Sequence, residues 1–307
     1  MGSAWTGGGE GQMWTKQHRA RHEARLKQVV MSAAVAEIAR WLERCDPPRS
    51  ARRTPLQRVV AALVWHLRVG GSWRALPPSF PAWRTVYGWF RRWLALGLFD
   101  VLLREVARRR RRSVGRKPGP SLAIVDTQAV KCIGVRGPRG YDAAKKVLGR
   151  KRVGLVDAAG HLLAIAVVPA SVQDRDTLTA LDVGKECWPS LREAVYDSAF
   201  AASRRSLATA GGRRCKATPR AERCREWSNL HSMRHRIEHR DPTAKGFVVI
   251  ARRWGVERSF SWLTHWGGLL RDRAGRLDVS AARIAFVAAV SGIEALINPV
   301  RACGAAS

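Results

Sequence analysis

Three acidic residues stand at places in the sequence where carboxylates could hold metal ions. Asp126 follows the apolar run 122–125, and Asp197 follows the apolar residues 194–196. Glu257 lies on an expected helix further along the chain. Each signal is weak alone, because an aspartate after a strand more often starts a turn or caps a helix. If the two strands are neighbours in one sheet, however, their carboxylates converge at one edge, which suits a hard cation such as Mg²⁺.

The net charge of the chain indicates a polyanionic partner. Lysine and arginine number 55 against 24 aspartates and glutamates, a formal charge of +31 at pH 7, and the basic residues gather in several separate tracts. A long polyphosphate fits such a distribution better than a small acidic substrate. A genome of high GC content would also favour arginine codons, and that alternative stays open. The 13 tryptophans and the long apolar runs favour a folded enzyme over a charged structural RNA-binding protein.

Metal-holding acids in a strongly basic chain fit metal-assisted attack on a phosphodiester. The nucleophile and the leaving group are both poor and the phosphate repels anions, so two ions about 3.5–4 Å apart are a common solution. Asp126, Asp197 and Glu257 would suffice as ligands for two Mg²⁺ ions, with Mn²⁺ as the alternative.

The first part of the chain has helical periodicity only. Residues 1–12 are glycine-rich and are expected to form a disordered leader. Residues 13–112 are expected to be an all-helical domain, with helices over 15–44, 54–69 and 83–96. Two short helices around a turn resemble a helix-turn-helix, although a plain helical domain with solvated arginines is the alternative.

Start and stop signals define the middle one of these helices. Thr54 is the expected N-cap, Pro55 the first helical residue and Gln57 the residue that returns to the cap. Gly70 is expected to end the helix.

The periodicity changes after a basic linker at 113–120, which follows the arginine run 108–112. Residues 121–300 are expected to form an α/β domain with a mixed sheet. Its predicted elements are a three-strand meander over 122–168 with a turn at 157–160, a helix at 174–183, strands at 194–196 and 246–250, and a helix at 254–263. This order suggests a ribonuclease-H-like fold.

Several tracts carry a resemblance to a known family. FVVIARRWGVERSFSWL at 247–263 resembles the glutamate motif of DDE transposases of the insertion-sequence-five family. AIVDTQAVK at 123–131, GPRGYDAAKKVLGRKR at 137–152 and PASVQDRD at 169–176 resemble further segments of that family, and residues 71–93 resemble its helical entry domain. Ala199 and Phe200 depart conservatively from the family pattern after the second aspartate, and 201–236 matches poorly.

The resemblance implies a ribonuclease-H-like catalytic domain, divalent-metal-dependent cleavage at transposon ends, and strand transfer into target DNA. Asp126, Asp197 and Glu257 occupy the DDE positions and would be both catalytic residues and metal ligands. The implied partner is double-stranded DNA, as terminal inverted repeats and target, bound by a homodimer. A catalytically inactive DNA-binding descendant and a ribonuclease-H-like nuclease without strand transfer are the alternatives.

The expected DNA contacts are basic or hydroxyl side chains in three places. They lie on the polar face of the second short helix, in the tract 137–152, and beside Glu257: Arg84, Thr85, Arg91, Arg92, Lys145, Lys146, Arg150, Lys151, Arg152, Arg253 and Arg258.

Cysteine spacing and hydropathy bear on location. The six cysteines show no CxxC spacing, which favours a reducing, cytoplasmic compartment, and the family resemblance implies the bacterial cytoplasm and its nucleoid. The apolar tract 284–297 contains Glu294 and is short, so it is expected to be a packed helix and not a membrane span.

Overall fold

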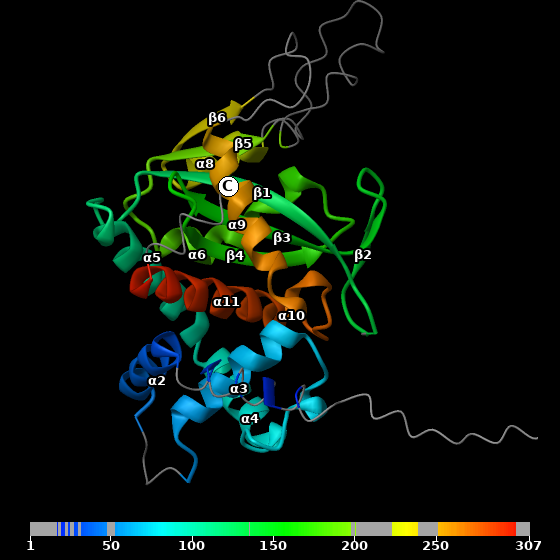
Figure 1. Ribbon diagram of the computed structural model, residues 1–307. Helices are drawn as coiled ribbons and strands as arrows, with labels where there is room; N and C mark the ends of the chain where they lie inside the picture. The colour runs from blue at the N-terminus through cyan, green and yellow to red at the C-terminus, as the bar shows by residue number, and fades with distance from the viewer. Residues whose placement is uncertain are drawn as a thin grey trace, which may run out of the picture.

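The first helices of the chain lie below the sheet that follows them in the view of the computed structural model in Figure 1. The structure describes residues 32–47, 53–134, 136–197, 200, 223–238 and 251–298, with a few positions between 17 and 29. The first helices are α2 (Ala33–Cys45), α3 (Leu56–Val69), α4 (Trp83–Ala95) and α5 (Leu98–Ser113). The leader 1–12, the start of the helix expected at 15–44 and the strand expected at 246–250 lie outside the described residues.

Helix α3 confirms the middle helix, with one correction at its start. Pro55 is the N-cap residue and no side chain caps the helix, so the expected Thr54 cap is wrong. At the other end Gly70 has φ of +80°, as a left-handed C-cap requires. A Cβ at Gly70 would lie 2.5 Å from the carbonyl carbon of Gly267, so glycine is also needed there for close approach of two backbones.

Helix α4 buries Val86, Phe90 and Trp93, as its periodicity predicts. Residues 70–82 connect it to α3 and include the 3-10 turn η1 (Trp73–Ala75). This connection is longer than the three or four residues of a helix-turn-helix, so the strict motif is not formed between α3 and α4. Helix α4 remains as a helix with one exposed polar face.

Helix α5 was not among the expected helices, and it includes the arginine run that precedes the linker expected at 113–120. The arginine run 108–112 forms the last turns of a helix that begins at Leu98. Arg111 is buried: its guanidinium donates to Asp157 and to the carbonyl oxygen of Lys117. The run contains no apolar residue, so its sequence is typical of a solvated segment. Arg111 is buried nevertheless, because Lys117 and Asp157, later in the chain, accept its hydrogen bonds.

The sheet has the order β4-β3-β1-β5-β6, with the short β2 on the same edge of β3 as β4. Its strands are β1 (Leu122–Lys131), β2 (Gly140–Asp142), β3 (Val147–Asp157), β4 (Leu162–Pro169), β5 (Glu193–Asp197) and β6 (Arg234–Glu238). β3 is antiparallel to β1 and β4, whereas β5 is parallel to β1 and β6 is parallel to β5. The predicted meander and the parallel addition of β5 are confirmed; β2 and β6 were not expected.

Helices cover both faces of the sheet. One face packs against α9 (Ala251–Thr264) and α11 (Leu277–Ile297), with α10 (Gly267–Leu270) between them in the chain. The other face packs against η3 (Leu178–Leu181), α6 (Asp182–Glu186) and α8 (Arg223–Leu230), and η2 (Asp174–Asp176) precedes them. The helix expected at 174–183 is thus a series of short turns.

Helix α11 lies between the N-terminal helices and the sheet (Figure 1). Its Phe286 packs edge-on against Phe99 of α5, with ring centroids 5.7 Å apart. One apolar cluster contains residues of α2, α3, α4, α5, α11 and the sheet, so the linker expected at 113–120 does not separate two cores. By length and composition α11 could cross a membrane, but its largely buried surface is that of a core helix.

Burial of His66 on α3 predicts a loss of stability in mild acid. His66 stacks on Trp73 at 3.8 Å, and burial, with the nearby Arg283, lowers its pKa to about 3. The unfolded chain binds this proton near pH 6.5 and the folded chain does not, so stability falls as the pH drops from 6.5 toward 3, by at most about 1.4 kcal/mol per pH unit. His66→Phe should flatten the decline of Tm over this range, and parallel Tm curves for the two proteins would contradict this assignment.

Candidate active site

Asp126 and Asp197 lie side by side on neighbouring parallel strands. The register pairs Val125 with Tyr196, so the next residues of β1 and β5 are the two aspartates. Side chains alternate along a strand, and Ile124 on β1 belongs to the cluster on the α9 face, which places Asp126 on that face. The same alternation from Val195 places Asp197 there. Strand spacing puts the two backbones about 4.8 Å apart.

Thr127 donates a backbone hydrogen bond to Asp126 and connects β1 to residues on the opposite face of the sheet. The Thr127 N–H donates to Asp126 Oδ1 at 2.7 Å, and the Thr127 hydroxyl donates to Asp174 Oδ1 at 2.9 Å. Lys151 Nζ then lies 2.9 Å from Asp174 and 3.3 Å from Asp142. Lys151 is therefore buried in an ion-pair network, which corrects its expected contact with DNA.

Glu257 lies on α9, the helix that packs on β1 and β3. Its neighbours Val256 and Phe260 are buried against the sheet, whereas Glu257 itself is exposed on the flank of the helix. Phe260 reaches Gly154, the cross-strand partner of Asp126, where a Cβ would lie 3.0 Å from its ring. Phe260, three residues after Glu257, is thus the residue of α9 that contacts the strand pair next to Asp126.

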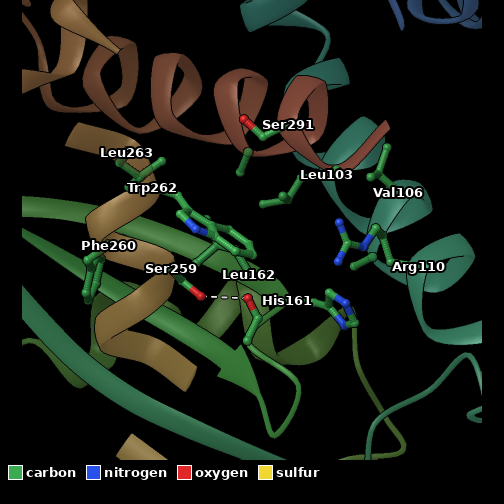
Figure 2. Close-up of a pocket in the computed structure, with 14 residues that line it drawn as sticks. Leu103, Val106, Arg110, His161, Leu162, Ser259, Phe260, Trp262, Leu263 and Ser291 are labelled. Atoms are coloured by element: carbon green, nitrogen blue, oxygen red, sulfur yellow. Dashed lines mark hydrogen bonds between the residues drawn. The ribbon is translucent and has the colours of Figure 1, made fainter. Parts of the chain in front are cut away.

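The turn between β3 and β4 seats α9. Ser259 Oγ donates to the Gly160 carbonyl oxygen at 2.6 Å (Figure 2), and Arg258 Nη2 donates to that of Ala159 at 2.8 Å. Gly160 has φ of +83°, and a Cβ there would lie 3.0 Å from the carbonyl oxygen of Gly255. The Arg258 guanidinium thus contacts this turn, which revises its expected role, and the Arg253 side chain lies outside the described residues.

The three acids do not form one closed ligand set. Among the described residues, no group of three or more His, Cys, Asp or Glu side chains is placed to hold a metal ion. The hard carboxylate oxygens of Asp126 and Asp197 suit a divalent cation, and Glu257 lies on the flank of α9, the covering helix. The structure thus brings two of the three predicted acids to adjacent positions and the third to the helix above them.

Glu238 is an acid that the sequence pattern did not reveal. The register of β5 with β6 pairs it with Asp197, so Asp126, Asp197 and Glu238 occupy one row across three parallel strands. The pattern misses it because β6 is short and rich in charged residues, without an apolar run before the glutamate. Only its pairing with Asp197 reveals Glu238, and no local feature of the sequence marks that register.

Arg150 and Arg152 are buried and do not face solvent, contrary to their expected contact with DNA. Arg152 donates to Gln128 Oε1 at 2.9 Å and to the Leu269 carbonyl oxygen. Arg150 lies 3.2 Å from Asp272, and burial lowers the pKa of Arg152 to about 10. The high charge of the tract therefore does not indicate a DNA-binding surface at these two residues. Their long side chains hold the segment around α10 to β3.

Exposed basic residues remain on α4 and on the β2–β3 turn. Arg84, Thr85 and Arg91 are exposed, as expected. Arg92 is also exposed, but it forms two 2.7 Å hydrogen bonds to Asp46 and thereby ties α4 to the end of α2. On the turn after β2, Lys145 and Lys146 are exposed.

An apolar cavity of about 60 Å³ lies between α9, α5 and α11. Figure 2 shows Leu103 and Val106 of α5, Trp262 of α9 and Ser291 of α11 around it, with Arg110 at its rim. None of its lining residues is an acid. The cavity is therefore separate from the acidic row, and its lining does not suit a metal or a phosphate.

Two protein families match separate parts of the chain. Residues 117–292, more than half of the chain, match the family described as "Transposase DDE domain". Residues 33–103 match the family described as "Putative transposase of IS4/5 family".

Matches to individual proteins are short. The chain is 38% identical over 56 residues to "Uncharacterized protein y4sN" of Sinorhizobium fredii (strain NBRC 101917 / NGR234), which covers 18% of this chain and 45% of that protein. No solved structure matches the chain. The match over 117–292, with that over the N-terminal helices, shows that the chain belongs to the DDE transposases of the IS4/IS5 group.

Proposed function

We propose that this chain is an active transposase that cleaves DNA at transposon ends and joins those ends to target DNA. The observation that carries the proposal is the in-register placement of Asp126 and Asp197 on adjacent parallel strands, on the face that α9 covers. Membership of the DDE family supports the reaction class. The order β4-β3-β1-β5-β6, antiparallel on one side of β1 and parallel on the other, supports a ribonuclease-H-like fold.

Asp126 and Asp197 would hold the divalent ions, and Glu257 would join them from α9. We propose Mg²⁺, with Mn²⁺ as a substitute, and two ions per site. When bound, the ions would activate the attacking oxygen and stabilise the negative charge of the phosphate. The chain itself contributes by holding Asp126 through Thr127 and by seating α9 on the β3–β4 turn.

A plasmid assay tests the proposal against its alternatives. The full chain is incubated with Mg²⁺ and a plasmid that carries the gene with its flanking DNA. The proposal requires breaks at both element boundaries and products in which those ends are joined to new sites. Cleavage without joining would leave a nuclease, and binding without cleavage would leave an inactive descendant, which the position of Glu257 on the flank of α9 would then explain.

The proposal divides the work between two parts of the chain. Residues 13–112 would choose the DNA end and residues 121–300 would contain the chemistry, because the exposed arginines of α4 lie in the first part and all acids of the row in the second. The protein would act as a homodimer on DNA, in the bacterial cytoplasm at the nucleoid.

Substitutions on α4 should separate base reading from phosphate contact. Arg84→Ala or Arg91→Ala is expected to weaken binding to the terminal repeat by roughly 1–3 kcal/mol if that arginine reads a base, and to change binding to random DNA less. Competition between terminal-repeat and scrambled duplexes at fixed salt measures this. Arg92→Ala is the matched control, because its hydrogen bonds to Asp46 are internal. Equal losses on both duplexes would make the arginines phosphate contacts.

A further inference from the structure

A hairpin that projects at the end of the sheet away from α5 carries features that the acidic row does not explain (Figure 1). We call residues 136–148 the hairpin arm; it contains β2, the turn 143–146 and the start of β3. The arm has four basic residues, all exposed: Arg136, Arg139, Lys145 and Lys146. Its single acid, Asp142, is buried. All charged side chains on the outer surface of the arm are therefore cationic.

An apolar pair interrupts this cationic surface. Tyr141 of β2 and Leu148 of β3 are 55% and 52% exposed, although both are large apolar side chains. They are directly opposite in the antiparallel register, so their Cβ atoms are about 4.5–5.5 Å apart and the side chains form one patch. The patch has an aromatic and an aliphatic member and is bordered by lysines on the adjoining turn.

The arm is fixed to the core at both ends of β2. Asp142 accepts hydrogen bonds from the N–H groups of Ala144 and Lys145 at 3.0 Å each, and its other oxygen lies 3.3 Å from buried Lys151. Arg150 Nε donates to the Pro138 carbonyl oxygen at 2.8 Å. A patch held in this way loses little conformational entropy on binding, which favours affinity.

The arm also reaches the strand that carries the first aspartate. Lys145 Nζ lies 3.4 Å from the carbonyl oxygen of Thr127, the residue next to Asp126. Lys145 thus connects the turn of the arm to the strand that carries Asp126. A second copy of this chain is a poorer occupant, because two proteins of charge +31 repel each other where neither presents acids.

We propose that the hairpin arm is a DNA-contact element: its basic residues meet phosphates, and Tyr141 and Leu148 pack on sugars and base edges. This inference rests on the proposed function for its partner. It adds an apolar, salt-insensitive contact to a surface that would otherwise bind by charge alone, and it assigns that contact to two residues outside the acidic row.

The salt dependence of binding separates the two kinds of contact. Affinity of the full chain for a fluorescein-labelled random duplex is measured by anisotropy over a salt series. Tyr141→Ala should lower the affinity about fivefold or more at every salt concentration, with an unchanged slope. Lys145→Ala or Lys146→Ala should reduce the log–log slope by about 0.9 for each phosphate that the variant no longer neutralises. Tyr141→Phe should bind like the wild type, because the ring and not the hydroxyl makes the contact.

Val183→Ala is the matched control, since Val183 is 75% exposed on α6 and should not change the affinity. Unchanged affinity in Tyr141→Ala and Leu148→Ala, with intact wild-type binding, would overturn the inference. Altered sedimentation of the DNA-free variants would also overturn it and would make the pair an interface between copies. A wild type that binds DNA but does not cleave it would refute the proposed function and leave the arm's role standing.

Discussion

Asp126→Asn is expected to lower metal-dependent DNA cleavage by at least about 10²–10³-fold, while binding to DNA stays within about twofold of the wild type. The neutral amide keeps the shape of the side chain but removes a negative ligand, so the charge-stabilising effect of the bound ion is lost. Binding depends on lysine and arginine and should be retained. Nicking of a plasmid with Mg²⁺ and electrophoretic binding to the same DNA measure the two effects.

Variants of the other acids define the ligand set. Asp197→Asn should behave like Asp126→Asn, because the two residues are in register on adjacent strands. Glu257 and Glu238 are the two candidates for the third ligand, because Glu257 lies on α9 and Glu238 lies beside Asp197 in the sheet. Glu257→Gln and Glu238→Gln distinguish them. Full cleavage by Asp197→Asn would refute the paired site. Loss in Glu238→Gln with retention in Glu257→Gln would move the third ligand into the sheet.

Asp272→Asn is expected to lower the free energy of unfolding by about 3–5 kcal/mol, because it removes the charge of a buried carboxylate among buried arginines. Asp272 is 5% exposed and lies 3.2 Å from Arg150. Its charge also raises the pKa of Arg152 and that of Arg283, which burial lowers. Without it, three buried guanidinium groups would face one another with carbonyl oxygens as their main remaining acceptors.

Urea unfolding followed by circular dichroism measures this effect. Asp278→Asn is the matched control, because its partner Arg276 is exposed and the pair should contribute about 1 kcal/mol or less. If the two variants lost equal stability, the buried arginines would not depend on Asp272 for their charge balance.

The central strands could be predicted from the sequence because an apolar run precedes each aspartate. Residues 123–125 and 194–196 are buried whichever face of the sheet they point to, which gives continuous apolar runs. Asp197 ends β5, but the expectation that Asp126 ends its strand is wrong, because β1 continues to Lys131. The parallel pairing of β1 and β5 followed from the helical segment expected between them. The place of Glu257 on a helix after the sheet was equally readable, although its distance from the aspartates depends on how α9 is seated on Gly160.

Other features depend on contacts distant in sequence and could not be read locally. Arg111, Arg150 and Lys151 look like surface residues, but each is neutralised or hydrogen-bonded by a residue or carbonyl far along the chain. Glu238 belongs to the acidic row only because β6 pairs with β5 in one particular register. Whether a charged side chain is buried depends on such partners distant in sequence. Composition and periodicity contain no information about them.

The shared apolar cluster of α5 and α11 also limits how such proteins can be recombined. A fragment from residue 121 onward would expose the side of α11 that packs on Phe99 and its neighbours, so it should aggregate instead of folding independently. Grafting the N-terminal helices of one relative onto the sheet of another would need matching replacements on α11. Exchange of end specificity should therefore proceed through surface changes on α4 more readily than through shuffling of whole domains.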